Sequence, residues 1–202
     1  MPLWLADKPL VLASKSAGRR ALLQAAGVPV EIMPADIDER GIENRAALSD
    51  PSEVAALLAR EKARAVATAM PGRLVLGADQ TLALDTRRFS KPKDRAAAAD
   101  QLRVLRGNTH ALHSAIAVAS GSAVLFEHVD VARLTMRPFS EDFLQFYLDT
   151  AGDAVTSSVG AYQLEGIGIQ LFDRIDGDYR TILGLPLLPL LQWLRQHGVL
   201  VA

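Results

Sequence analysis

Leu10-Val11-Leu12-Ala13-Ser14-Lys15-Ser16-Ala17-Gly18-Arg19-Arg20 is the stretch of this 202-residue sequence that decides the fold. Its first four residues form a short, partly β-branched apolar run, which predicts a buried strand that ends at Ser14. Residues 19–26 then place apolar side chains on one helical face, and Gly27 follows where a helix C-cap belongs. A strand, a loop and a helix in close succession are typical of an α/β protein.

The rest of the chain continues this alternation of strands and helices. Apolar and alternating runs predict further strands at residues 28–37, 74–78, 109–119 and 123–136. Capping residues and helical spacing predict further helices at residues 51–69, 95–105, 141–151 and 187–197. No repeat or flexible linker interrupts these elements, so we expect a mixed sheet flanked by helices in a single domain over residues 1–202.

Composition excludes several classes of protein. Half of the residues are apolar and 22% are charged, which is too apolar for a disordered chain and too charged for a membrane bundle. The net charge of -1 argues against bulk electrostatic binding to nucleic acid or to anionic lipid, so any anion site must be local. The chain lacks cysteine, and no targeting or membrane segment is visible, so we expect a cytoplasmic protein.

The loop from Ser14 to Arg20 is the first candidate site. Two hydroxyls and three cations precede a helix N-terminus, where backbone N–H groups, the helix dipole and guanidinium groups suit a polyphosphate. The loop lacks the glycine and lysine spacing of a P-loop. On residue types alone, a capped helix with solvated arginines explains it equally well.

Asp79 is the second candidate, because it directly follows the apolar run 74–78. We therefore expect it at the carboxyl end of a strand, where open α/β sheets bind their ligands. A structural cap is the alternative for such an acid. The context favours a functional carboxylate that emerges from a dry strand.

Other charged residues are weaker candidates when taken singly. Lys62 on the long helix and Lys91 before a proline are readily explained as solvated surface lysines. Glu39 follows other acids and would hold a cation or form an ordinary polar turn. The aspartates within residues 173–178 lack calcium-loop spacing, and the four histidines do not cluster as metal ligands, so we expect no metal site there.

Taken in order, these pieces resemble the Maf family of nucleoside triphosphate pyrophosphatases from about Leu10 to His197. The resemblance rests on the motifs Leu12-Ala13-Ser14-x-Ser16-x-x-Arg19, Asp38-Glu39, Arg60-Glu61-Lys62-Ala63, Gly77-Ala78-Asp79, Lys91-Pro92, Gly107-x-x-His110, Gly160-Ala161-Tyr162, Glu165-Gly166, Gly177-Asp178-Tyr179 and Gly184-Leu185-Pro186. So many short motifs in one order are hard to produce by chance.

The resemblance implies an elongated, two-lobed α/β fold with a central cleft, related to the inosine triphosphate pyrophosphatases. It implies cleavage between the α- and β-phosphates of a nucleoside triphosphate, which releases a nucleoside monophosphate and pyrophosphate with the help of Mg²⁺ or Mn²⁺. The substrate partner is then a nucleotide, with neither nucleic acid nor membrane involved. A homodimer is compatible with the sequence, which leaves the oligomeric state open.

The resemblance also implies roles for the candidate residues. The loop residues expected to bind the phosphates are Ser14, Ser16, Arg19 and Arg20, of which Arg19 occupies the position shared across the family. The lysines expected to neutralise them are Lys62 and Lys91. Glu39 and Asp79 are the implied metal ligands, and Asp79 is the implied proton acceptor.

Departures from the common family pattern point to a branch. Gln80 and Glu165 stand where the branch that cleaves dTTP and UTP usually has Thr and Gln, and both look like the branch that acts on 7-methyl-GTP. A carboxylate at Glu165, or an aromatic ring such as Tyr162, would favour the positively charged 7-methylguanine over a neutral pyrimidine. The alternatives are a dTTP/UTP pyrophosphatase and a nucleotide-binding regulator of septum formation without turnover.

Overall fold

The computed structural model describes residues 2–202, and its internal contacts divide the chain into two compact units. Unit 1 comprises the chain up to residue 80 together with residues 114–130 and 178–202, and unit 2 comprises residues 81–113 and 131–177. Three long strands contribute residues to both units, namely β3 (Val75–Leu84), β5 (Thr109–Ser120) and β6 (Ala123–Met136). The single domain expected from the sequence stays a prediction.

Unit 1 contains a mixed sheet, as the sequence predicts. Its strands follow the order β2 (Val30–Ile32), β1 (Leu10–Leu12), β3, β5 and β6. Strand β1 pairs in parallel with β2 on one side and with β3 on the other, with Val11 opposite Val75. The strand predicted at residues 28–37 is therefore only three residues long.

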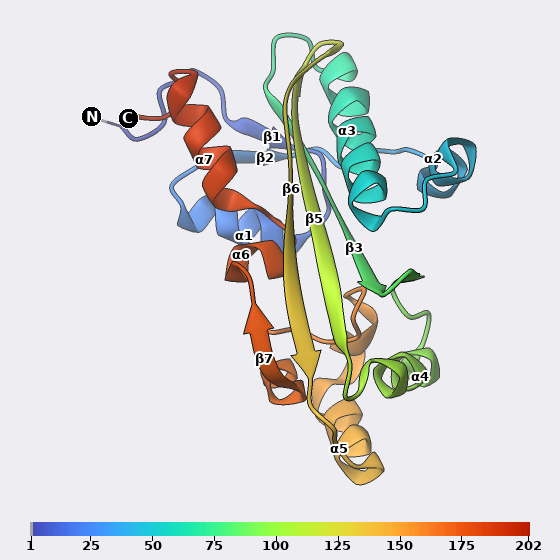
Figure 1. Cartoon of the computed structure of the whole chain (residues 1–202). Coiled ribbons are helices and arrows are strands. Elements are labelled where there is room, and N and C mark those ends of the chain that lie inside the picture. The colour runs from blue at the N-terminus through green and yellow to red at the C-terminus, as the bar shows by residue number, and fades with distance from the viewer. Residues whose placement is uncertain (1) are drawn as a thin grey trace. The chain divides into compact units, whose positions relative to one another are not determined.

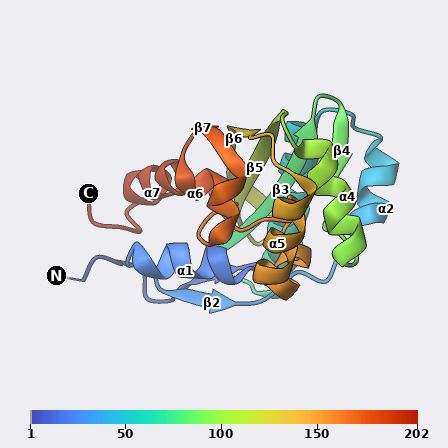
Figure 2. The same cartoon turned by 90° about the horizontal axis from the view of Figure 1, so that it is seen from below.

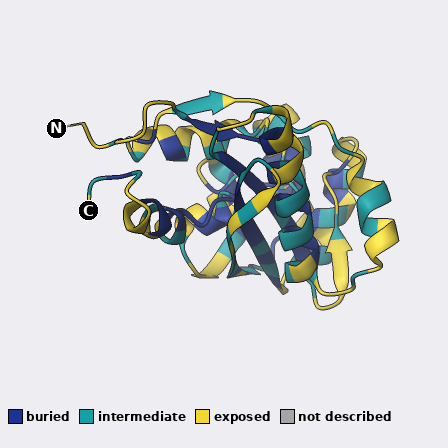
Figure 3. Cartoon of the chain, turned by 90° about the horizontal axis from the view of Figure 1, so that it is seen from above, coloured by how far each residue is buried: buried dark blue, intermediate teal, exposed yellow. Residues whose placement is uncertain are grey.

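Side-chain alternation along these strands divides the apolar core of unit 1 into two layers. Leu10, Leu12 and Leu76 pack with α1 (Ala17–Ala25) and α7 (Leu187–Gln196). On the other face, Val11 and Val75 pack against α3 (Pro51–Ala69). Figure 1 shows α3 on one side of the strands and α1 and α7 on the other. Strands β1, β3 and β5 are largely buried, whereas β2 and β6 are partly exposed (Figure 3).

A glycine allows α3 to approach β3 closely. A Cβ atom on Gly77 would lie 2.1 Å from the carbonyl oxygen of Ala59 and 2.6 Å from the backbone nitrogen of Ala63. Both contacts involve helix backbone, which has no flexible end that could move aside. Only glycine fits where β3 crosses α3. The close crossing brings Asp79, the last residue of the Gly77-Ala78-Asp79 motif, near the helix.

Polar side chains cap the N-termini of α1, α3 and two shorter helices in unit 1. Asp50 accepts hydrogen bonds from the backbone of Ser52 and Glu53 at the start of α3, as the sequence predicts. The short helix α2 (Glu39–Ala46) begins with a cap by Asp38, where the sequence analysis expected an acidic turn or cation site without a helix. Asp178 likewise caps α6 (Tyr179–Ile182), which the sequence analysis missed. One turn of helix carries too little periodicity to be recognised.

Unit 2 contains antiparallel strand pairs together with α-helices. β3 pairs antiparallel with β4 (Arg87–Phe89), and β6 pairs antiparallel with β7 (Phe172–Asp176). Helices α4 (Arg95–Leu105) and α5 (Glu141–Ala151) lie side by side (Figures 1 and 2). Two short 3₁₀ helices span Gly152–Thr156 and Ile167–Leu171. The sequence predicts both α-helices, but it misses the short strands.

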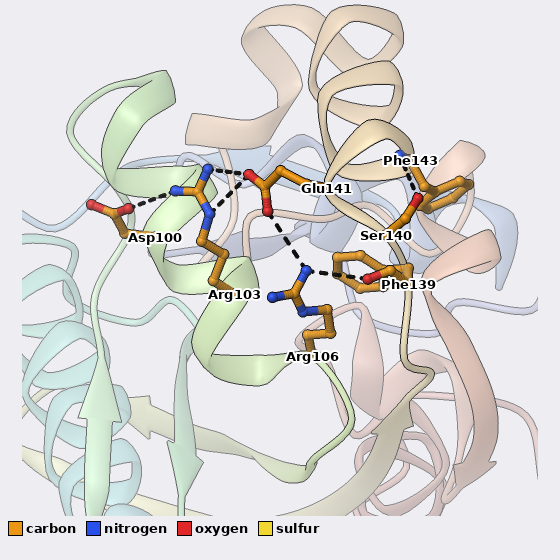
Figure 4. Close-up of polar contacts among 7 residues, drawn as sticks. All are labelled: Asp100, Arg103, Arg106, Phe139, Ser140, Glu141 and Phe143. Carbon is orange, nitrogen blue, oxygen red and sulfur yellow. Dashed lines mark hydrogen bonds and ion pairs between the residues drawn. The ribbon is translucent and has the colours of Figure 1, made fainter.

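A charged cluster joins α4 to the start of α5 (Figure 4). The Glu141 carboxylate accepts hydrogen bonds from the Arg103 guanidinium, and one of its oxygens lies 3.6 Å from Nη1 of Arg106. Arg106 also donates to the carbonyl of Phe139, 3.1 Å away. Glu141 lies in the first turn of α5, where the helix dipole favours a negative charge. These partly exposed pairs orient the two helices and add little stability.

We predict that Gly77→Ala destabilises the protein by about 3 kcal/mol, because the new methyl group cannot fit unless α3 moves away from β3. Gly18→Ala is the matched control. A Cβ at Gly18 would meet nothing closer than 3.8 Å, and alanine favours the helix there. Urea unfolding of both variants provides the measurement. An unchanged free energy of unfolding for Gly77→Ala would mean that the two backbones are further apart than described.

Candidate active site

Asp79 lies in the middle of β3, and the prediction that it ends a strand is wrong. The apolar alternation resumes after Gln80, and the strand runs on to Leu84 because its last residues pair with β4. Asp79 is two residues beyond Gly77, so its side chain points to the same face of the strand, toward α3. The residue is only 8% exposed.

Lys62 of α3 joins two carboxylates. Its Nζ atom donates to Oδ1 of Asp79 at 2.6 Å and lies 2.9 Å from Oε1 of Glu39. Glu39 is the first residue of α2, and α2 packs against α3. The Lys62 side chain is 12% exposed, whereas the Glu39 side chain is 48% exposed. The ammonium is thus largely removed from water and neutralised by one buried and one exposed carboxylate.

The oxygens of Asp79 and Glu39 are suited to hold a divalent cation. Both already contact a single cationic group, the Lys62 ammonium, so they are near enough to contact one metal ion. Mg²⁺ in phosphate-handling sites is typically bound by one or two carboxylates, with waters and substrate oxygens as the remaining ligands. Among residues 2–202 there is no group of three or more acidic, histidine or cysteine side chains that could hold a metal. A cation held by these two carboxylates would take its other ligands from water or from a bound molecule.

The loop after β1 presents the predicted hydroxyls and Arg19. Ser16 caps α1 by accepting from the backbone N–H of Arg19, and the Ser14 hydroxyl accepts from the backbone N–H of Ser16. The Arg19 guanidinium donates to the Ser14 hydroxyl at 3.1 Å, to the Ala78 carbonyl at 2.8 Å and to the Gly184 carbonyl at 2.8 Å. Arg19 thereby connects this loop to the residue that precedes Asp79.

Electrostatics links Arg19 to the carboxylates. Burial lowers the pKa of Arg19, and the negative charges of Asp79 and Glu39 oppose that shift. The guanidinium uses Nε and Nη1 for its bonds to the protein, which leaves Nη2 to receive an anion. Arg20, the next residue, is exposed.

Gln80 points to the opposite face of β3 from Asp79, as strand alternation requires. Its Nε2 atom donates to the Ser114 hydroxyl at 2.8 Å and to the carbonyls of Thr181 and Ile182 at 3.1 and 3.0 Å. Ser114 donates to the same Thr181 carbonyl, at 2.7 Å. The amide nitrogen of Gln80 is therefore occupied by protein acceptors, and any contact with a ligand would use its Oε1 atom.

The short segment from Thr181 to Gly184 contributes carbonyl oxygens to the site, and the sequence analysis assigned it no role. Carbonyls at the end of a helix lack intrahelical partners. Here Gln80 and Ser114 satisfy those of α6, and Arg19 satisfies that of Gly184. The motifs at residues 177–179 and 184–186 flank this segment. Its acceptors are backbone carbonyls, which every residue has, so the residue types could not reveal its role.

Two predicted substrate-binding residues belong to unit 2. Lys91 follows β4 and is exposed. Glu165 is also exposed, directly after the buried Leu164. Tyr162, considered as a ring that could stack on a base, is 5% exposed, and its hydroxyl bonds to His110. The ring is therefore unavailable for stacking. Unit 1 by itself brings together Ser14, Ser16, Arg19, Glu39, Lys62, Asp79 and Gln80.

The family model and the similar proteins found by comparison agree with one another. The family model described as Maf-like protein matches residues 9–197. A nucleoside triphosphate pyrophosphatase of Rhodopseudomonas palustris (strain ATCC BAA-98 / CGA009) is 58% identical over 200 residues, which cover 99% of each chain. A 7-methyl-GTP pyrophosphatase of Rhizobium etli (strain ATCC 51251 / DSM 11541 / JCM 21823 / NBRC 15573 / CFN 42) is 53% identical over 193 residues, which cover 95% of this chain and 97% of the relative.

Similarity to solved structures is more distant. A HAM1 protein from Coxiella burnetii is 18% identical, with a TM-score of 0.42 over 63% of this chain and 72% of that chain. Within residues 2–202, no helix has the length and apolar character needed to cross a membrane.

We predict that Arg19→Ala weakens the binding of inorganic triphosphate by about 1.5 to 3 kcal/mol, while Arg20→Ala has a smaller effect. Arg19 is held by three protein acceptors beside the carboxylates, so its remaining N–H groups are preorganised for an anion. Titration calorimetry measures both affinities, and thermal unfolding confirms that each variant is folded. Equal losses, or a larger loss for Arg20→Ala, would contradict the assignment of Arg19 as the phosphate-binding arginine.

Proposed function

The chain belongs to the Maf family, and we propose that it hydrolyses a nucleoside triphosphate to the nucleoside monophosphate and pyrophosphate. We further propose that its preferred substrate carries a modified purine, 7-methylguanine in the first place. Relatives at 55% to 59% identity bear the name nucleoside triphosphate pyrophosphatase, and the 7-methyl-GTP pyrophosphatase at 53% identity supports the narrower substrate. The cytoplasmic location and the homodimer stay predictions.

The observation that carries this proposal is the chain of contacts from the loop after β1 to the acidic pair. Arg19 bonds to Ser14 and to the carbonyl of Ala78, and the next residue, Asp79, bonds to Lys62. The donors proposed to bind phosphate thus lie in the same unit as the buried carboxylate, and Arg19 bonds to the residue directly before it. Such an arrangement suits the attack of water on a phosphoric anhydride, which needs charge stabilisation and a proton acceptor.

Each side chain contributes a separate part of the mechanism. Arg19 and the Ser14 and Ser16 hydroxyls bind phosphate oxygens, and Lys62 neutralises negative charge as it builds up in the transition state. The Asp79 carboxylate orients the attacking water and accepts its proton. A divalent cation, when bound by Asp79 and Glu39, supplies additional neutralisation of the polyphosphate charge. Lys91 gives a further positive charge for the phosphates.

Selectivity for the base is assigned to Glu165. An exposed carboxylate attracts the positively charged ring of 7-methylguanine and has no such attraction for a neutral pyrimidine. Gln80 supplies an acceptor through Oε1, because its amide nitrogen already bonds to Ser114 and to α6. Tyr162 makes no direct contact with the base in this proposal, since its ring is buried.

We predict that kcat/KM is higher for 7-methyl-GTP than for dTTP or UTP. The charge on the methylated ring adds an attraction to Glu165 that the pyrimidines lack. A panel of natural and methylated triphosphates, assayed for pyrophosphate release, provides the measurement. A preference for dTTP or UTP would overturn the choice of base and leave the reaction type intact.

We predict that Asp79→Asn lowers kcat by about 100- to 10,000-fold, the usual range for loss of a general base. The amide keeps the shape of the carboxylate, so the variant should remain folded and still bind a triphosphate. Asp7→Asn, an exposed aspartate in the same unit, is the matched control. A loss that is restored by excess Mg²⁺ would assign Asp79 to metal binding alone. Near-full activity would remove it from the mechanism and favour a binding protein without turnover.

A further inference from the structure

His110, near the start of β5 in unit 2, lies in an aromatic pocket and is only 1% exposed. Its Nε2 atom is 2.7 Å from the hydroxyl of Tyr162. The ring of Phe172 packs against both, with ring centres 4.8 Å from Tyr162 and 5.9 Å from His110. The other ring nitrogen of His110, Nδ1, is buried without a hydrogen-bond partner among the described residues.

This polar pair is a poor device for stability alone. Burial lowers the pKa of His110 to about 4, so the ring is neutral at physiological pH. A neutral imidazole with one unsatisfied nitrogen costs free energy in an apolar pocket, whereas two apolar side chains of similar shape would fill the space without that cost. The polar pair therefore provides something that apolar contacts would not, namely a hydrogen bond that fixes the direction of the Tyr162 side chain.

Tyr162 belongs to the loop of residues 157–166, whose backbone is strained. Ala161 adopts a left-handed conformation with φ of 59°, which is unfavourable for a residue with a Cβ atom. The preceding residue, Gly160, has to be glycine in this conformation, since a Cβ there would lie 2.2 Å from the Tyr162 ring. Such strain persists only where the surroundings hold the backbone in place.

Side chains from three separate elements hold this loop. Gln101 of α4 donates to the Val159 carbonyl, and Tyr147 of α5 donates to the Ala161 carbonyl at 3.0 Å. Within the loop, the Ser158 hydroxyl donates to the carbonyl of Tyr162 at 2.6 Å and accepts from its N–H at 3.1 Å. His110 of β5 makes the third hydrogen bond from outside the loop. It differs from the other two because it reaches a side chain, the Tyr162 hydroxyl.

The anchored loop leads directly to an exposed carboxylate. Leu164 is buried and 7% exposed, and the next residue, Glu165, is exposed. We propose that His110 is a positioning residue, which holds the loop 157–166 through Tyr162 and so fixes the direction of the Glu165 carboxylate. The link to base selectivity rests on the proposed function of Glu165, whereas the link to loop order stands without it.

The test compares His110→Leu combined with Tyr162→Phe against the unchanged protein. The two substitutions remove both polar partners together, so no new unpaired group is left and the pocket stays filled. Thr109→Val combined with Thr135→Val is the matched control, because it removes a side-chain hydrogen bond of 2.9 Å from the neighbouring residue of β5 without touching the loop. His110→Gln, which retains an N–H group able to reach Tyr162, is the conservative variant.

Amide hydrogen exchange of the protein without nucleotide is the first readout. We expect the amides of residues 157–166 to exchange at least about tenfold faster in the His110/Tyr162 double variant, while helices α4 and α5 keep their protection and the melting temperature changes by only a few degrees. The threonine control should show no change, and His110→Gln should recover most of the protection. Unchanged exchange in the loop, or equally faster exchange throughout unit 2, would overturn the proposal.

Selectivity is the second readout. The ratio of kcat/KM for 7-methyl-GTP to that for dTTP should fall about tenfold in the double variant, through a higher KM for the methylated nucleotide with kcat nearly unchanged. Glu165→Gln should lower the ratio similarly, and adding it to the double variant should lower it little further. A ratio that falls in Glu165→Gln but not in the double variant would refute positioning by His110. If Glu165→Gln leaves the ratio unchanged while loop exchange is accelerated, the assigned role of Glu165 fails and the anchoring of the loop stands.

Discussion

The contact between the backbones of β3 and α3 at Gly77 is the constraint on which the candidate site depends. With no Cβ at this position, the helix lies against the strand so closely that any side chain would overlap its carbonyl and amide groups. Two residues further along the same face of the strand is Asp79, and next to Ala63 on the helix is Lys62. Their 2.6 Å contact follows from how near the two elements lie. A larger residue at Gly77 would separate the Asp79 carboxylate from the Lys62 ammonium.

Strand alternation then distributes the chemistry of Asp79 and Gln80. Consecutive residues point to opposite faces, so Asp79 meets Lys62 and α3, while Gln80 meets Ser114 and the carbonyls that end α6. Arg19 connects the two sides, since it bonds to the carbonyl of Ala78 and to that of Gly184. One strand thus places a charged side chain on one face and, on the other, a neutral side chain whose amide nitrogen bonds to protein acceptors. This separation keeps the buried carboxylate from competing for the donors that hold α6.

The charges of the site are compatible with the proposed polyphosphate substrate, although the chain as a whole has a net charge of -1. Arg19 and Lys62 are partly buried, and each is held by oxygen atoms in an environment less polar than water. Positive charge that is fixed and shielded from solvent acts more strongly on a phosphate than the same charge on the surface. The sign and strength of the field are therefore set locally, which a whole-chain charge cannot show. In unit 2, the neutral His110 and Tyr162 pair shows the opposite use of burial, in which polar groups hold a loop and carry no charge.

The sequence by itself determined the elements whose signals lie within a few neighbouring residues. The opening strand, loop and helix could be predicted, and so could the strands at residues 109–119 and 123–136, the long helix at residues 51–69 and the family motifs. Alternation, helical period and capping are local properties. Only the tertiary structure decided that Asp79 lies within a strand, that Gln80 bonds to carbonyls about a hundred residues away, and that Tyr162 is buried against His110. Hydrogen bonds and ion pairs of this kind depend on which distant segments pack together. That packing cannot be predicted from residue types alone. For the same reason, Lys62, Glu39 and Asp79 could be identified from the sequence only as separate candidates. The packing of α2, α3 and β3 places the Lys62 ammonium between the two carboxylates.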